Sequence, residues 1–154
     1  MRPLSSDARE FIHLLNTKSV KYLIVGAWAV AFHGRPRYTG DLDIFVSREA
    51  DNTVRLMQVI DAFGFRQAGI SREDFSQPDY VVQLGRAPNR IDILTGITGV
   101  SFDEAWNSRQ EGNIGDATVH VISRDLLIRN KQATGRDKDL ADVKLLEKAP
   151  RRRS

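Results

Sequence analysis

The segment from Val25 to Val46 reads VGAWAVAFHGRPRYTGDLDIFV and decides most of what can be inferred about this chain. The apolar run at 21–25 leads into Gly26, which is typical of a strand that turns directly into a helix. The Ala-rich stretch 27–32 predicts a buried helix that a glycine ends. After a loop with Pro and Gly, residues 41–46 alternate polar and apolar side chains. We therefore predict a strand, a helix and a second strand in close succession.

Two acidic residues, Asp41 and Asp43, lie on the second of these predicted strands. Residues two apart on a strand point to the same face, roughly 6.6 Å from each other. Carboxylates so placed repel and raise each other's pKa unless a cation lies between them, and their hard oxygens suit Mg²⁺ or Mn²⁺. The same spacing is also common on the solvent face of an edge strand, so the pair alone leaves both interpretations open.

A third acidic residue, Asp92, lies between Ile91 and Ile93 in a later apolar run. Asp is depleted in strands, so its presence there needs a reason. If that strand adjoins the first acidic pair, three carboxylates converge, enough to hold two Mg²⁺ ions around a triphosphate. Gly26 adds a close backbone approach and a helix N-terminus that can hold phosphate, although an ordinary tight turn explains this glycine equally well.

The rest of the chain supplies further helices and strands around this segment. Helical periodicity is expected at 7–17, where Asp7 and Glu10 form a capping-box pattern, and at 48–63, 101–106, 124–133 and 138–149. Strands are expected at 80–84, 90–94 and 117–122, the first two joined as a hairpin. Four or five strands interleaved with helices predict an α+β fold, a mixed β-sheet flanked by helices.

Composition restricts the class of protein. The chain has 154 residues, 41% hydrophobic and 28% charged, which is typical of one soluble globular domain. We expect a single domain over residues 1–150 and a basic disordered tail at 151–154. Cysteine is absent, which excludes disulfides, thiolate nucleophiles and Cys-type zinc sites. No apolar run approaches the roughly 20 residues of a membrane span, and we expect a cytoplasmic protein that contacts no membrane.

Net charge argues mildly against a large nucleic-acid partner. The formal net charge is +3, and the three arginines at 151–153 account for all of it. The remaining body is neutral, whereas a tRNA backbone would call for several clustered lysines or arginines.

Taken together, the segment from residue 25 to 46 and the third acidic strand resemble the active-site region of the DNA polymerase beta-type nucleotidyltransferase superfamily. The form HGRPRYTGDLD is similar to a small bacterial branch that includes minimal nucleotidyltransferases, lincosamide-type transferases and toxin-like transferases of abortive-infection systems. The later stretch KQATGRDKDLAD, residues 131–142, resembles the ending K-x-x-x-x-R-x-K-D-x-x-D of that branch. A helix surface laced by ion pairs explains the later stretch about as well.

The resemblance implies a site and a reaction. Asp41, Asp43 and Asp92 would be the catalytic residues and would ligate Mg²⁺ or Mn²⁺, with Asp92 also activating an acceptor hydroxyl. The predicted nucleotide-binding residues are Gly26, Ala27, Arg37, Thr39, Lys131 and Lys138. The expected activity moves a nucleoside monophosphate from an NTP, ATP among them, to an acceptor hydroxyl on a protein, a tRNA end or a small molecule.

One departure from the family pattern supports an alternative function. Ala27 stands where the family usually has Gly or Ser, and Trp28 follows at once. We expect Trp28 to point into the core, away from the nucleotide. The alternative is a catalytically degenerate nucleotidyltransferase fold that serves as a nucleotide-binding or protein-interaction module, with a small protein partner of the toxin–antitoxin type.

Overall fold

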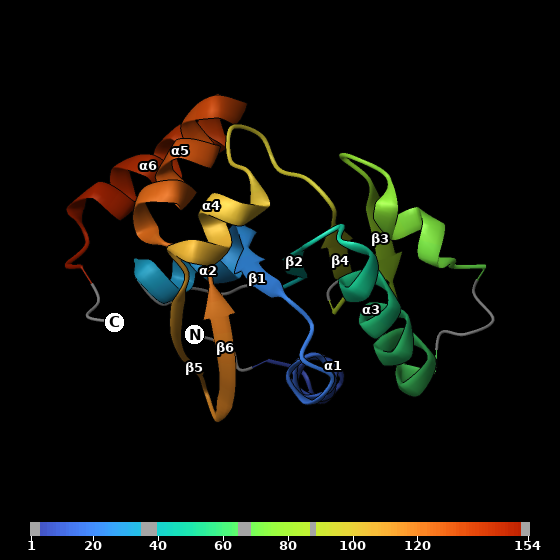
Figure 1. The fold of residues 1–154 in the computed structure, drawn as a ribbon. Coiled ribbons are helices and arrows are strands. Elements are labelled where there is room, and N and C mark those ends of the chain that lie inside the picture. The colour runs from blue at the N-terminus through green and yellow to red at the C-terminus, as the bar shows by residue number, and fades with distance from the viewer. Residues whose placement is uncertain (1–3, 35–39, 65–68, 87–88, 152–154) are drawn as a thin grey trace.

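The computed structural model describes residues 4–34, 40–64, 69–86 and 89–151 (Figure 1). The predicted site residues Arg37 and Thr39 lie outside these ranges, as do residues 152–154 of the predicted tail. Arg151, the first residue of that tail, is exposed and forms an ion pair with Asp125, with Nη2 3.1 Å from Oδ1.

The described residues form one six-stranded mixed sheet with the order β3-β4-β2-β1-β6-β5. The strands are β1 (Tyr22–Val25), β2 (Leu42–Val46), β3 (Val81–Leu84), β4 (Ile91–Leu94), β5 (Gln110–Ile114) and β6 (Ala117–Val121). Strands β2 and β4 are parallel, as are β1 and β6, whereas the pairs β1–β2, β3–β4 and β5–β6 are antiparallel. The prediction of an α+β fold with a mixed sheet is confirmed.

Helices flank this sheet. They are α1 (Ser6–Thr17), α2 (Gly26–His33), α3 (Ala50–Phe63), α4 (Phe102–Asn107), α5 (Arg124–Thr134), α6 (Asp137–Lys148) and the 3-10 helix η1 (Arg72–Ser76). In Figure 1, α5 and α6 lie side by side near the β6 half of the sheet, and α3 and η1 lie near the β3 half. None of the helices in the described part of the chain combines the length and apolar composition that a membrane crossing requires.

Local sequence signals explain where most helices begin and end. The Ser101 hydroxyl and the Glu104 carboxylate form the predicted capping box of α4. Gly64 ends α3 in the left-handed conformation, with φ of 99°. The predicted cap of α1 was wrong: Ser5 is the N-cap, and its hydroxyl accepts a hydrogen bond from the amide of Ala8 at 3.1 Å.

Two elements were missed by the sequence patterns. The residues of β5 read QEGNI, and only Ile114 is buried. This strand lies at the sheet edge, so it shows almost no apolar alternation, and its backbone pairing with β6 holds it in place. The sequence patterns gave no helix for the polar connection at 69–79, which contains η1. A capping box between Ser71 and Asp74 begins this 3-10 helix.

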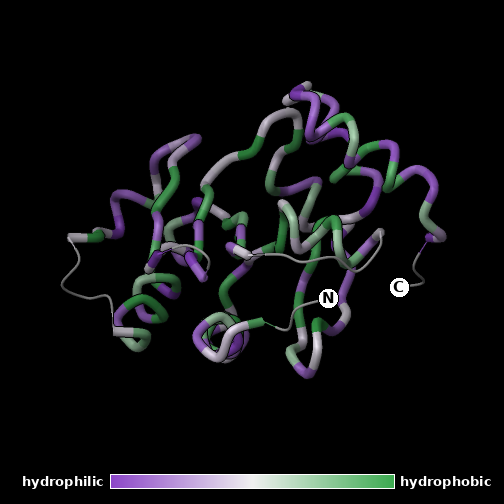
Figure 2. The backbone as a smooth tube through the Cα atoms, turned by 180° about the vertical axis from the view of Figure 1, so that it is seen from behind, coloured by the Kyte–Doolittle hydropathy of each residue, from purple (hydrophilic) through white to green (hydrophobic). Residues whose placement is uncertain are grey.

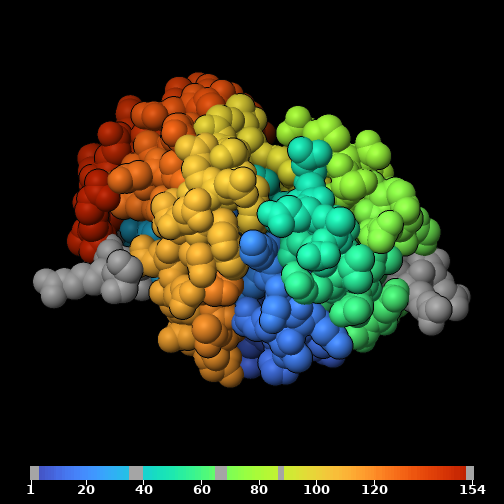
Figure 3. All heavy atoms as spheres, in the orientation of Figure 1, coloured from blue at the N-terminus to red at the C-terminus, as the bar shows by residue number. Residues whose placement is uncertain are grey.

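The core lies between the central strands and the helices. All four residues of β1 are buried, and so are six consecutive residues of α2, from Trp28 to His33. Figure 2 shows apolar backbone concentrated in the central strands, and hydrophilic stretches along the outer helices α5 and α6. On the face seen in Figure 3, α1 lies between the β5–β6 hairpin and α3, and Phe11 of α1 meets Phe63 of α3 edge to face.

His33 is a structural residue of this core. Its side chain is 3% exposed, and its Nε2 lies 2.7 Å from the backbone carbonyl of Ile122, just after β6. The ring therefore joins the end of α2 to the end of β6, and no function needs to be assigned to it.

Candidate functional site

Strand register brings two of the three predicted carboxylates side by side. Asp43 on β2 is the direct partner of Asp92 on β4, and the strands are parallel neighbours. Both side chains therefore point to the same face of the sheet. Asp41 lies just before β2, and its Oδ1 accepts a hydrogen bond of 3.0 Å from the backbone amide of Arg90. All three acidic residues thus lie where β2 and β4 begin.

Arg90 lies among these carboxylates and was not anticipated. Its Nε donates to Asp92 Oδ1 at 2.7 Å, and its Nη2 donates to Asp92 Oδ2 at 3.1 Å. The same Nη2 atom is 3.4 Å from Asp41 Oδ2. One guanidinium nitrogen therefore bridges two of the three predicted metal ligands. The signal was present in the sequence, because Arg90 and Asp92 are two residues apart at the start of a strand and so share a face.

Asp43 is the carboxyl group most affected by this environment. Burial, the negative charges of Asp92 and Asp41, and a hydrogen bond with Asp92 raise the pKa of Asp43 to about 7, although Arg90 opposes the rise. The charged form of this half-buried carboxylate beside two others is therefore disfavoured at neutral pH, and a cation would stabilise it. Strongly shifted groups of this kind are a mark of functional sites.

The donor chemistry of the three residues fits a divalent cation such as Mg²⁺. Carboxylate oxygens are the ligands that Mg²⁺ prefers, and the raised pKa of Asp43 reflects a need for positive charge. Within the ranges described above, no three His, Asp or Glu side chains are already grouped to hold a metal ion. Arg90 contacts Asp41 and Asp92 instead.

Gly26 lies directly beside this acidic cluster. Its φ is 66°, and a Cβ atom built on it would overlap Asp43 Oδ2. Only glycine leaves room for the carboxylate while adopting this backbone conformation. Gly26 is also the first residue of α2, so the amide groups of the first turn begin next to Asp43. The next residue, Ala27, is half-buried in the same turn.

Trp28 lies in the hydrophobic core, as expected. Its side chain is 2% exposed and belongs to the hydrophobic core. Its indole Nε1 donates a hydrogen bond of 3.2 Å to the carbonyl of Gly40, the residue before Asp41. The indole therefore joins the first turn of α2 to the residue that precedes Asp41.

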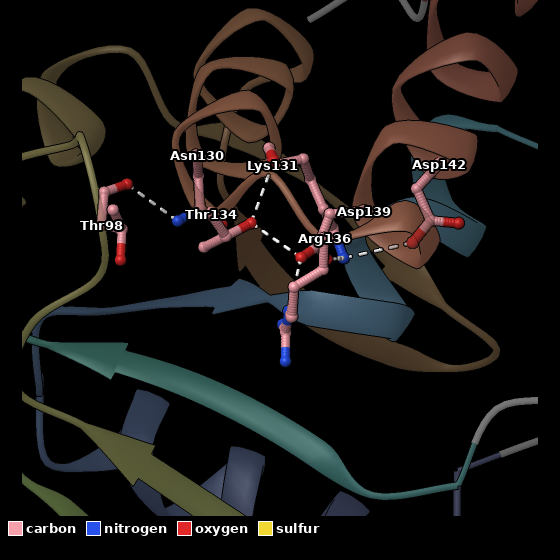
Figure 4. Close-up of polar contacts among 7 residues, drawn as sticks. All are labelled: Thr98, Asn130, Lys131, Thr134, Arg136, Asp139 and Asp142. Atoms are coloured by element: carbon pink, nitrogen blue, oxygen red, sulfur yellow. Dashed lines mark hydrogen bonds and ion pairs between the residues drawn. The ribbon is translucent and has the colours of Figure 1, made fainter.

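The two predicted nucleotide contacts near the end of the chain lie in different surroundings. Lys131 on α5 is buried, and its Nζ is 3.3 Å from Asp139 Oδ1 and 3.2 Å from Asp142 Oδ2, both on α6 (Figure 4). Arg136 Nε donates to Asp139 Oδ2 at 2.7 Å. The 131–142 motif therefore ties α5 to α6 by buried ion pairs, whereas Lys138 is exposed.

Replacing Gly26 with Ala is expected to lower both stability and nucleotide binding. The added methyl group needs an unfavourable backbone conformation and must displace the Asp43 carboxylate, together about 2–4 kcal/mol. Gly115→Ala is the matched control, because Gly115 has φ of 61° and an added Cβ there meets nothing within 4 Å. Thermal melts should show a small loss for Gly115→Ala and a larger one for Gly26→Ala. Equal losses would mean that contact with Asp43 contributes nothing.

The chain is similar to known proteins in both sequence and fold. A family model described as "Nucleotidyl transferase of unknown function (DUF2204)" matches residues 4–153. No curated protein gave a significant match. A solved nucleotidyltransferase-like protein from Paracoccidioides brasiliensis is 15% identical, with a TM-score of 0.52, over 95% of this chain and 77% of that one.

A second solved structure is similar over nearly its whole length. It is the lincosamide antibiotic adenylyltransferase LnuA with lincomycin bound, 16% identical, with a TM-score of 0.56, over 96% of this chain and 99% of that one. At such identities the two solved structures establish the shared fold.

Proposed function

The chain belongs to this nucleotidyl transferase family, and from that premise we propose that it transfers a nucleoside monophosphate from an NTP to an acceptor hydroxyl with the aid of Mg²⁺. The observation that carries the proposal is the pairing of Asp43 with Asp92 beside the open turn at Gly26. This arrangement places negative charge that can bind a cation next to backbone amides that can bind phosphate.

Asp41, Asp43 and Asp92 would hold the metal. When bound, Mg²⁺ would supply positive charge to the carboxylates and to the phosphate oxygens alike. The amide groups of Gly26 and Ala27 at the start of α2 are the protein's own phosphate donors. The reaction also needs the acceptor and the α-phosphate held in line, which is a positioning task for the surrounding chain.

The proposed bond changes are balanced without a covalent enzyme intermediate. The acceptor oxygen forms a bond to the α-phosphorus while the bond from that phosphorus to the bridging oxygen of the β-phosphate breaks. Pyrophosphate leaves with the electron pair of that bond. Asp92 accepts the proton of the acceptor hydroxyl, as general-base catalysis requires.

The test is transfer of label from an α-³²P-labelled nucleotide. Purified protein is incubated with Mg²⁺ and each of the four NTPs, with host lysate as the source of acceptors, and labelled protein, RNA and small molecules are separated. ATP is the first choice, because one solved structure of this fold is an adenylyltransferase. Asp92→Asn should give no label. Asp103→Asn, an exposed carboxylate on α4, should give the wild-type amount.

The alternative of a degenerate nucleotide-binding or partner-binding module makes the opposite prediction. With such a module, none of the four NTPs would give labelled protein, RNA or small molecules. Retention of full label by Asp92→Asn would also contradict the assignment of Asp92, while leaving the membership of the family intact.

A further inference from the structure

Arg90 occupies the position between carboxylates that the proposed function gives to a metal ion. Three contacts hold its guanidinium: Nε and Nη2 donate to the two oxygens of Asp92, and Nη2 also meets Asp41 Oδ2 at 3.4 Å. A fork of this type is among the strongest ion pairs in proteins. A cation of the protein itself therefore neutralises the pair.

The backbone of Arg90 is fixed while its side-chain end has room to move. The amide of Arg90 donates to Asp41 Oδ1 at 3.0 Å, and its carbonyl accepts from the amide of Leu42 at 2.9 Å. Its side chain is 31% exposed, against 25% for Asp41 and 14% for Asp92. The guanidinium therefore has a path into solvent that leaves both carboxylates and β4 in place.

The ion pairs of Lys131 make a useful contrast. There the lysine side chain is 11% exposed and its partners Asp139 and Asp142 are 2% and 6% exposed. Lys131 is thus more buried than Arg90, and its ion pairs join two helices, α5 and α6. Its contacts are those of a structural ion pair, whereas the carboxylates that Arg90 contacts are the ones proposed to bind metal.

We propose that Arg90 is a resident counter-ion that competes with a divalent cation for Asp41 and Asp92. This inference rests on the proposed function, because it concerns the metal expected at the same carboxylates. In the free protein Arg90 offsets part of the repulsion between the carboxylates. A divalent cation must displace the guanidinium to reach Asp41 and Asp92. Arg90 therefore lowers the affinity of the site for the cation, and it acts through the carboxylates rather than on the substrate.

The test is the affinity of the metal-free protein for Mn²⁺, measured by isothermal titration calorimetry for wild type and Arg90→Ala. Loss of the competing cation should tighten Mn²⁺ binding by about tenfold. Arg90→Lys keeps the charge but has no fork to bridge two carboxylates, so its affinity should lie between the two. Arg72→Ala, which removes an exposed arginine of η1, should bind Mn²⁺ as wild type does.

Thermal melts give a readout that is independent of activity. Without metal, Arg90→Ala should melt below wild type, because Asp41, Asp43 and Asp92 then lack their counter-ion. Mn²⁺ should raise the Tm of Arg90→Ala more than that of wild type. If Arg90→Ala does not fold, Arg90→Lys is compared with wild type in the same way, and its rise in Tm with Mn²⁺ should exceed that of wild type by a smaller amount.

The possible outcomes separate this inference from the proposed function. Equal or weaker Mn²⁺ binding by the Arg90 variants overturns the competition and makes Arg90 a structural residue, whatever the labelling assay shows. Tighter binding by the variants supports it even where no acceptor is found. Absence of Mn²⁺ binding in wild type and variants alike overturns both the competition and the metal dependence of the proposed transfer.

Discussion

Replacing Asp43 with Asn should abolish nucleotide transfer while making the metal-free protein more stable at pH 8. The amide removes a proposed metal ligand, and loss of a group that acts only with its partners lowers rates by about a thousandfold or more. The same change removes the charge that burial and the neighbouring Asp92 and Asp41 make unfavourable. Loss of activity and gain of stability in one variant would be hard to explain by damage to the fold.

The stability gain should depend on pH in a defined direction. Because the pKa of Asp43 is raised to about 7 in the folded protein, the folded state holds its proton more tightly than the unfolded state does. Wild type therefore loses stability as pH rises from about 4 to 7. Asp43→Asn escapes this loss, so its advantage should be absent at pH 4 and on the order of 2 kcal/mol at pH 8.

Thermal melts without metal at pH 4, 6 and 8 measure this advantage, and the labelling assay measures activity. Asp103→Asn is the control, since it removes an exposed carboxylate from α4 and should leave both measurements unchanged. A lower Tm for Asp43→Asn at pH 8 would contradict the electrostatic argument. Full transfer by this variant would remove Asp43 from the site.

The sequence predicted the elements that have strong local signals. The strand, glycine turn and helix at 21–33 were found because apolar runs, Gly26 and Gly34 mark them directly. The edge strand β5 was not predicted, because backbone pairing with β6, and not a buried apolar face, holds its polar residues in the sheet. Gly112 within it, normally unfavourable in a strand, makes room for the ring of Phe32 from α2.

The candidate site was predictable as a set of residues but not as a set of contacts. Strand parity and the family resemblance selected Asp41, Asp43 and Asp92, and the register of β2 and β4 brings them together. Arg90 was passed over although its spacing from Asp92 on one strand was visible in the sequence; its contact with Asp41 depends on which strands are neighbours, a fact that periodicity does not contain. The ion pairs of Lys131 were not anticipated for the same reason, since its partners lie on a different helix. The nucleotide role of Lys131 stays a prediction.

Three charged residues of the 131–142 motif, Lys131, Asp139 and Asp142, are buried inside the protein. Burial alone would raise the pKa of Asp139, but hydrogen bonds from Arg136, Thr134 and Lys131 outweigh it and lower that pKa to about 2. Asp139 is therefore ionised at all ordinary pH values, and its charge needs the cations around it (Figure 4). Lys131 also contacts Asp142, so it connects two buried acidic residues of α6.

Replacing Lys131 with Met should accordingly destabilise the protein by about 3 kcal/mol, because it removes the buried cation that Asp139 and Asp142 share. The Tm should fall by about 10 °C at pH 7. Lys138→Met, which removes the exposed lysine of the same motif, should change stability by less than about 0.5 kcal/mol. Adding Asp142→Leu to Lys131→Met should recover part of the loss, since an apolar pair can replace a buried ion pair. A Lys131→Met variant with wild-type stability and reduced nucleotide transfer would instead return Lys131 to the nucleotide site.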